Sequence, residues 1–162
     1  MATGTILLPI MGCVLDAASP PGYAFTNSRP KLLFDDSTDE IVYWTFRMPV
    51  DYSSSPVLKV FFSMAGANTD DEIVFDCLVM AVSDGDAVDM DTDSYDATNA
   101  ATKTVPDTAG RPDEVSVTLA NADGVAAGDF VALKAFRDAD AVADDAQSDM
   151  EVWAASLEYT TT

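Results

Sequence analysis

Histidine is absent from the 162 residues of this chain, and cysteine occurs only at positions 13 and 77. Without histidine, a Ser-His-Asp triad, a Cys-His nucleophile and a histidine-ligated zinc site are all excluded. Cys13 and Cys77 can form one disulfide or remain free thiols. Because Cys77 falls within an apolar stretch at 73–82, a buried free thiol is the favoured interpretation.

Basic residues are scarce as well. Lysine and arginine number 8 against 28 aspartates and glutamates, which gives a formal net charge of −20. Such a surface repels phosphate backbones, so direct binding of nucleic acid is not expected. The excess of acidic groups favours solubility, and it would also suit a salty medium or a basic partner.

Long hydrophobic runs are missing too. The apolar run at 6–8 stops at Pro9, and the first basic residue is Arg29, so the start lacks the pattern of a secretory signal. No run approaches the roughly 20 residues that a membrane-spanning helix needs. We therefore expect a soluble protein, made in a cytoplasm and without a membrane partner.

What the chain does contain is a series of β-strand patterns. Between residues 40 and 48, Val42, Trp44 and Phe46 fall on one side of a strand, where they should line a core. The main predicted strands are 31–34, 40–48, 56–65, 72–82, 103–105, 114–119, 130–137 and 150–159. Turn signals separate these strands and no helical period competes with them. The pattern predicts an all-β fold: an antiparallel, jelly-roll-like β-sandwich of about eight main strands.

The sandwich is expected to occupy residues 29–162, with residues 1–28 as an N-terminal arm or edge segment. Within that segment, the consecutive prolines 20 and 21 lack ladder donors and predict an irregular path. A short strand at 6–9 would either reach a neighbouring subunit or pair with its own domain. In the last strand, Trp153, Ala155, Leu157 and Tyr159 are predicted to share one face.

Several outward-facing positions are too apolar for a surface in contact with water. On the predicted strands these are Tyr43, Phe61, Leu78, Met80, Phe130 and Phe136, and the N-terminal segment adds Ile6, Leu7 and Leu8 as interface candidates. One interpretation is that a neighbouring subunit covers them in a homo-oligomer. The other is that a bulge or a register shift turns some of them inward.

The densest group of carboxylates lies in a long loop that begins at residue 83. Its candidate calcium ligands are Asp84, Asp86, Asp89, Asp91 and Asp93. A flexible aspartate loop can supply the oxygen ligands that calcium prefers, but Ser94 and Ala100 stand where an EF-hand has glycine and glutamate. The alternative is an ordinary solvated loop. That interpretation is favoured for a second cluster, which comprises Asp138, Asp140, Asp144 and Asp145.

Enzymatic activity is not expected. Paired carboxylates suffice for glycoside hydrolysis, but among 28 acidic residues some pair will always look plausible. A carbohydrate-binding module is a stronger alternative, because exposed aromatic side chains can stack on sugar rings. The loop aromatics that could do so are Tyr23, Phe25, Tyr52 and Tyr95. They could equally close the ends of the sandwich or sit in subunit contacts.

Several short segments, in this order along the chain, resemble a group of small structural proteins of tailed phages and marine viruses. They are WTFRMPVDY at 44–52, SDGD at 83–86, DTDSYD at 91–96, AGDF at 127–130, RDA at 137–139 and LEY at 157–159. The resemblance covers roughly residues 30–160. No catalytic or binding residues are defined for that group, so none are transferred to this chain.

The resemblance implies a virion protein, most often a capsid decoration or cement protein on the capsid exterior. Such a protein stabilises the shell through contacts with the major capsid protein or other virion proteins, commonly as a homotrimer. An apolar contact face and an N-terminal arm would suit that role. The alternatives are a carbohydrate- or receptor-binding module of the virion and a tail or baseplate sandwich.

Overall fold

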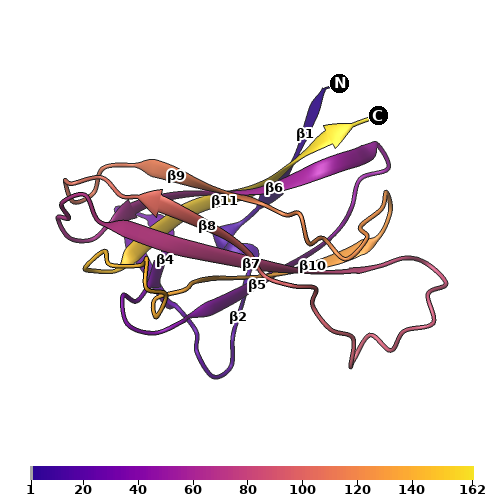
Figure 1. Cartoon of the computed structure of the whole chain (residues 1–162), viewed down its shortest axis with the longest axis horizontal. Helices are drawn as coiled ribbons and strands as arrows, with labels where there is room; N and C mark the ends of the chain where they lie inside the picture. The colour runs from indigo at the N-terminus through magenta and orange to yellow at the C-terminus, as the bar shows by residue number, and fades with distance from the viewer. Residues whose placement is uncertain (1) are drawn as a thin grey trace.

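The computed structural model describes residues 2–162, which form two antiparallel β-sheets packed face to face (Figure 1). The elements are β1 (Thr3–Leu8), a 3-10 turn η1 (Ile10–Gly12), β2 (Val14–Leu15), β3 (Gly22–Thr26), β4 (Arg29–Phe34), β5 (Ile41–Arg47), β6 (Tyr52–Met64), β7 (Glu72–Val82), β8 (Asn99–Thr104), β9 (Asp113–Thr118), β10 (Phe130–Arg137) and β11 (Met150–Thr161). The predicted all-β antiparallel sandwich is confirmed.

Each sheet has a continuous path of paired strands. The six-stranded sheet has the order β3-β4-β11-β6-β9, and β1 pairs with β11 beside β4. The five-stranded sheet has the order β2-β5-β10-β7-β8. Neighbours such as β11 and β6 are far apart in the sequence, so the sandwich is held together by long-range pairing.

The core lies between the two sheets, where the alternation of each strand places its apolar side chains. In β6, Leu58, Val60 and Phe62 are fully buried, as the period of two predicts. Phe34 of one sheet meets Phe75 of the other with ring centroids 5.8 Å apart, edge to face. Contacts of this kind join the sheets across the core.

The N-terminal segment contributes strands to both sheets. β1 pairs with β11 from Thr3↔Thr160 to Leu8↔Ala155, so the N- and C-terminal ends lie side by side in Figure 1. β2 joins β5, and β3 forms a hairpin with β4 directly after the two prolines. Residues 2–28 therefore lie along the edges of the sandwich. β3 was not among the predicted strands, because the two prolines before it predict an irregular path.

The loop between β10 and β11 is anchored by a buried ion pair. Arg137 and Asp144 have side chains 0% and 1% exposed, and their closest N–O distance is 2.6 Å. Arg137 also donates to the carbonyl oxygens of Ala146 and Ser148, and the Asp145 carboxylate accepts from the backbone N–H of Glu72. The prediction that this cluster is a solvated loop is wrong for Asp144, because its partner Arg137 draws it into the interior.

Both cysteines are free thiols. Cys77 is fully buried in β7, as its apolar surroundings predict, and burial raises the pKa of its thiol. Cys13 is half-buried, and its thiol donates to the carbonyl oxygen of Ile10. Within residues 2–162, no helical segment has the length and the apolar character needed to cross a membrane.

Candidate functional site

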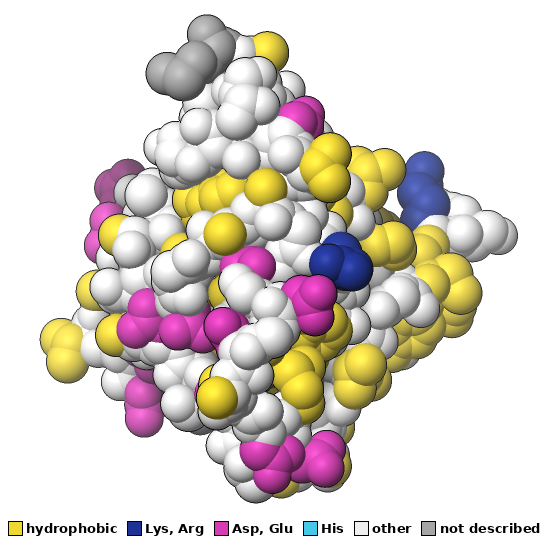
Figure 2. Space-filling view, turned by 90° about the vertical axis from the view of Figure 1, so that its right-hand side faces the viewer, with side chains coloured by type: hydrophobic (Ala, Val, Ile, Leu, Met, Phe, Trp, Pro, Cys, Tyr) yellow, Lys and Arg dark blue, Asp and Glu magenta, His cyan; other side chains and the backbone are white. Residues whose placement is uncertain are grey.

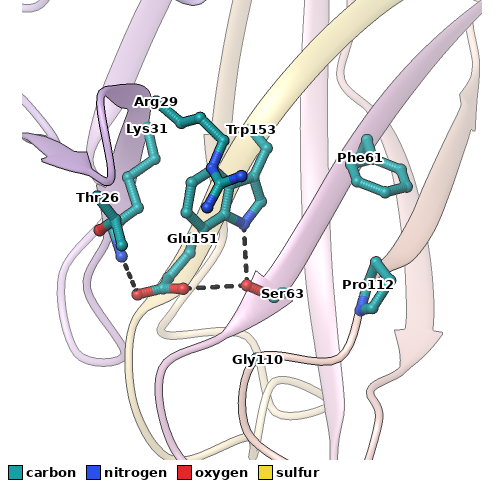
Figure 3. Close-up of a pocket in the computed structure, with 9 residues that line it drawn as sticks. All are labelled: Thr26, Arg29, Lys31, Phe61, Ser63, Gly110, Pro112, Glu151 and Trp153. Carbon is teal, nitrogen blue, oxygen red and sulfur yellow. Dashed lines mark hydrogen bonds and ion pairs between the residues drawn. The ribbon is translucent and has the colours of Figure 1, made fainter.

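A groove of about 630 Å³ lies on the outer face of the six-stranded sheet (Figure 3). Its lining residues come from β3, β4, β6, β11 and the loop before β9: Thr26, Arg29, Lys31, Phe61, Ser63, Gly110, Pro112, Glu151 and Trp153. Figure 3 shows Trp153 and Glu151 along the middle, with the β3–β4 hairpin on one side and Phe61 and Pro112 on the other. The volume falls in the range of small-molecule sites.

β11 contains a β-bulge at Trp153. Val152 pairs with Phe62 and Ala154 pairs with Phe61, so Trp153 is an extra residue between two successive pairs. A bulge interrupts the alternation of a strand and redirects one side chain. Here the bulge changes the phase after Trp153, so that Ala155, Leu157 and Tyr159 face the core. The indole itself is in phase with Glu151 and projects from the outer face, where it is only half-buried.

The bulge overturns one prediction. Ala155, Leu157 and Tyr159 share the core-facing side of β11 and are buried, but Trp153 does not lie with them. A strict period of two from 153 to 159 gives the right face for three of these residues. It fails at Trp153 because the bulge comes directly after Val152.

A chain of polar contacts holds the indole in place. The Trp153 Nε1–H donates to Ser63 Oγ at 2.9 Å, and the Ser63 hydroxyl lies 3.0 Å from Glu151 Oε2, to which it donates (Figure 3). Lys31 Nζ donates to the other Glu151 oxygen and lies 5.0 Å from the centroid of the Trp153 ring. A cation over an indole face is a favourable contact. Ser63 and Lys31 are buried, so the ring orientation is fixed before any ligand arrives.

Other groups in the groove remain open to a ligand. The side chain of Phe61 is 43% exposed. Arg29 and Thr26 are exposed, and within residues 2–162 the Arg29 guanidinium forms no ion pair or side-chain hydrogen bond. The face continues past Phe61 into a second hollow of about 260 Å³ that Leu7 and Glu114 also line.

The arrangement is suited to binding a molecule that has both apolar faces and hydroxyl groups. Trp153 and Phe61 offer aromatic surface, and Arg29 offers several N–H donors in a planar fork. The groove is lined by two cationic side chains, Arg29 and Lys31, and by one carboxylate, Glu151. It is therefore less acidic than the chain as a whole.

The predicted calcium loop does not bring its carboxylates together. Asp84, Asp86, Asp89 and Asp91 are exposed and Asp93 is half-exposed. Several of them accept from nearby backbone N–H groups instead: Asp86 from Ser83, Asp89 from Asp91 and Asp93 from Ser94. Within residues 2–162, the one group of three carboxylates whose oxygens lie within 4.8 Å of one another is elsewhere, at Asp39, Asp138 and Asp140.

The apolar interface candidates fall into three sets. Leu7 and Phe61 are exposed, at 77% and 43%, as predicted for outward-facing positions. Leu8 and Met80 are buried by other parts of the chain, at 3% and 7% exposure. Ile6, Tyr43, Leu78, Phe130 and Phe136 are half-buried. In the face drawn in Figure 2, hydrophobic side chains gather toward the right and acidic ones lie mainly toward the left and bottom.

Part of the covering comes from the chain itself. The loop after β7 returns along the five-stranded sheet, where the backbone N–H of Asp96 donates to Val79 at 2.8 Å. Tyr95 then packs on Tyr43 with ring centroids 6.3 Å apart, and the Tyr43 hydroxyl donates to Asp16 at 2.9 Å. A neighbouring subunit is therefore not needed to cover Tyr43.

The aromatic residues predicted to bind sugars lie outside the groove. Tyr52 is buried against Tyr159, with ring centroids 5.8 Å apart, and Tyr95 is half-buried against the sheet. Tyr23 and Phe25 are 40% and 59% exposed but lie on the face of β3 opposite to Thr26. The prediction named loop aromatics, whereas the exposed aromatic surface of the groove comes from strands.

No protein-family model matches the chain, and no curated protein matches its sequence. Solved structures with a similar fold include several carbohydrate-binding modules. The xylan-binding module CBM15 has a TM-score of 0.52 and 8% identity, over 99% of this chain and 99% of that chain. The CBM35 module of Abf62 from Cellvibrio japonicus has a TM-score of 0.49 and 8% identity, over 98% and 99%.

A third similar structure is the second N-terminal cellulose-binding domain of β-1,4-glucanase C from Cellulomonas fimi. Its TM-score is 0.46 and its identity is 19%, over 94% of this chain and 88% of that chain. At these identities the similarity describes the fold. Any function has to be argued from the groove of this chain.

Proposed function

We propose that this chain is a carbohydrate-binding module that holds a glycan in the groove on the outer face of the six-stranded sheet. A pyranose ring has an apolar C–H face and a rim of hydroxyl groups. Trp153 and Phe61 would stack on the apolar face, and Arg29 and Thr26 would bond the rim. The adjoining hollow near Leu7 provides room for a further sugar unit.

The observation that carries the proposal is the placement of Trp153. Trp153 is a large aromatic side chain on the outer face of the sheet, in phase with Glu151 and on the opposite face to the buried Val152. Three side chains, Ser63, Glu151 and Lys31, then hold its ring in a fixed orientation. A surface that is organised before binding loses less entropy when the ligand binds.

A glycan array with the purified protein tests the proposal, followed by calorimetric titration of each ligand found. Xylan oligosaccharides are the first probes, since the xylan-binding module CBM15 has a similar fold. We expect saturable binding of at least one glycan. An array without any binder would contradict the proposal.

The Phe61→Ala variant should bind that glycan about fivefold more weakly, since an aromatic contact contributes about 1 kcal/mol. The matched control is Phe25→Ala, which removes an exposed phenylalanine on the other face of the hairpin. Calorimetry should give unchanged affinity for the control. Equal losses in both variants would place the ligand outside the groove.

The module is expected to bind glycans without cleaving them. Glycoside hydrolysis requires two carboxyl groups that flank the scissile bond. Among the nine residues that line the groove, Glu151 is the one carboxylate, and it already bonds Lys31 and Ser63. Incubation with the glycan ligand should release no new reducing ends.

The motif resemblance supports a narrower proposal, in which the module belongs to a virus particle and binds glycans of a host surface. The predicted capsid partner, capsid decoration role and trimer stay predictions. Multi-angle light scattering tests the trimer, for which the mass should be three times the 17.2 kDa of one chain. A mass of one chain at micromolar concentration would contradict it.

A further inference from the structure

Three carboxylates from two distant parts of the chain converge at one end of the five-stranded sheet. Asp39, just before β5, and Asp138 and Asp140, just after β10, have oxygens within 4.8 Å of one another. The register of β5 against β10 explains why these carboxylates lie close together. Phe136 pairs with Ile41, so extending the ladder by two residues sets Asp138 opposite Asp39, on the same face.

A fourth carboxylate, Asp76 of β7, is buried beside this cluster. Asp76 pairs with Phe136 across the β7–β10 ladder, which puts its side chain on the same outer face as Asp138. It is only 5% exposed, yet its Oδ1 has no hydrogen-bond partner among the described residues. A buried carboxylate oxygen without a partner is unfavourable unless another positive or donating group meets it.

The backbone holds the cluster in place. The N–H of Ala139 donates to Asp39 Oδ1 at 2.9 Å, which ties the loop before β5 to the loop after β10. The buried pair of Arg137 with Asp144 anchors the second loop directly beside Asp138. Arg137 forms hydrogen bonds with Asp144 and with two backbone carbonyls, so its positive charge is already paired within the loop.

These carboxylates carry like charges and repel one another. Burial, followed by the charges of Asp138 and Asp39, raises the pKa of Asp76 to about 6. Burial, a hydrogen bond with Asp140 and the charges of Asp39, Asp140 and Asp144 raise the pKa of Asp138 to about 6. A cation placed among the carboxylates would relieve both the repulsion and the missing partner.

We propose that Asp39, Asp138 and Asp140, with Asp76 behind them, bind a hard divalent cation, for which calcium is the best match. All four donors are carboxylates, and oxygen ligands without histidine or cysteine suit calcium or magnesium rather than zinc or copper. Calcium accepts irregular geometry, which fits ligands from a strand and two loops. The site lies on the opposite sheet from the groove, so it stands independently of glycan binding.

The melting temperature of the protein, freed of metal with EDTA and then titrated with CaCl₂, tests the site. With calcium about 100 times above its Kd, the midpoint should rise by about 5–10 °C, and MgCl₂ should raise it less. NaCl of matched ionic strength separates binding from screening. An unchanged midpoint in millimolar calcium would overturn the proposal.

Two isosteric variants locate the ion. Asp138→Asn should lose most of the response to calcium, whereas Asp91→Asn, in the exposed loop that follows β7, should keep it in full. The opposite result would place the ion in that loop and overturn the proposal. Both variants keep the size of the side chain, so a folding defect would appear in EDTA as well.

Asp76→Asn supplies a second measurement. In EDTA at pH 7 this variant should melt above the parent protein, because it removes a buried charge that Asp39 and Asp138 repel. In saturating calcium at pH 7, the parent protein should melt above the variant. The reverse order there would contradict a role for Asp76 in cation binding.

Discussion

Replacing Arg137 by methionine should lower the free energy of unfolding by about 3–5 kcal/mol, because it leaves a charge buried without its partner. Arg137 is 0% exposed, and it binds Asp144 through Nε and Nη2 at distances from 2.6 to 3.1 Å. Its loss also frees the carbonyl oxygens of Ala146 and Ser148. Urea unfolding, followed by tryptophan fluorescence, measures the change.

The control for this experiment is an ion pair at the surface. Lys59 and Glu114 are 3.1 Å apart, with side chains 25% and 45% exposed. Lys59→Met should change the free energy of unfolding by about 1 kcal/mol or less, since exposed pairs contribute little. An Arg137→Met variant as stable as Lys59→Met would contradict the role of Arg137 as the anchor of the β10–β11 loop.

Replacing Trp153 by alanine should weaken glycan binding by about 30-fold, which corresponds to about 2 kcal/mol for a central tryptophan. The indole supplies the largest aromatic surface in the groove. Because it lies outside the core, the variant should keep most of its stability. Calorimetric titration with the glycan found on the array gives the affinity, and thermal melting gives the stability.

Trp153→Phe separates stacking from ring orientation. Phenylalanine keeps an aromatic face but cannot donate to Ser63. We expect this variant to bind a few-fold more weakly than the parent protein and more tightly than Trp153→Ala. If Trp153→Ala binds as tightly as the parent protein, the ligand does not occupy this groove.

The sandwich was predictable because its strands obey a simple alternation. The predicted strands 72–82 and 130–137 coincide with β7 and β10 residue for residue. Both are long, apolar and bounded by turn residues. β3 escaped prediction because Pro20 and Pro21 suggest a break, whereas they only precede the strand.

The outward position of Trp153 was not predicted, because a period of two carried back from Tyr159 across the bulge places this residue on the core side. No local signal around Trp153 marks the bulge; the register of β6 against β11 reveals it. The alternation of β6 correctly predicts that Phe61 faces outward, but it does not show that Phe61 lies beside Trp153. Pairing of β11 with β6 and β4, far away in the sequence, is what places Trp153 beside Ser63 and Lys31.

The acidic cluster illustrates the same limit. The density of aspartates pointed to the loop that contains Asp84 and Asp93, where side chains bond their own backbone instead. Asp39 and Asp138 lie 99 residues apart, and only the register of β5 against β10 brings them together. Local composition therefore shows where carboxylates are dense in the sequence, but the pairing of distant strands determines which carboxylates lie close together.

Glycan binding in the groove is tested most directly with the two tryptophans as reporters. Protein labelled with 5-fluorotryptophan has two ¹⁹F resonances, one from Trp153 in the groove and one from Trp44, which is 3% exposed in the core. Titration with the glycan from the array should shift the Trp153 resonance saturably and leave that of Trp44 unchanged. If the glycan saturates the protein and the Trp153 resonance does not shift, the glycan does not bind in this groove.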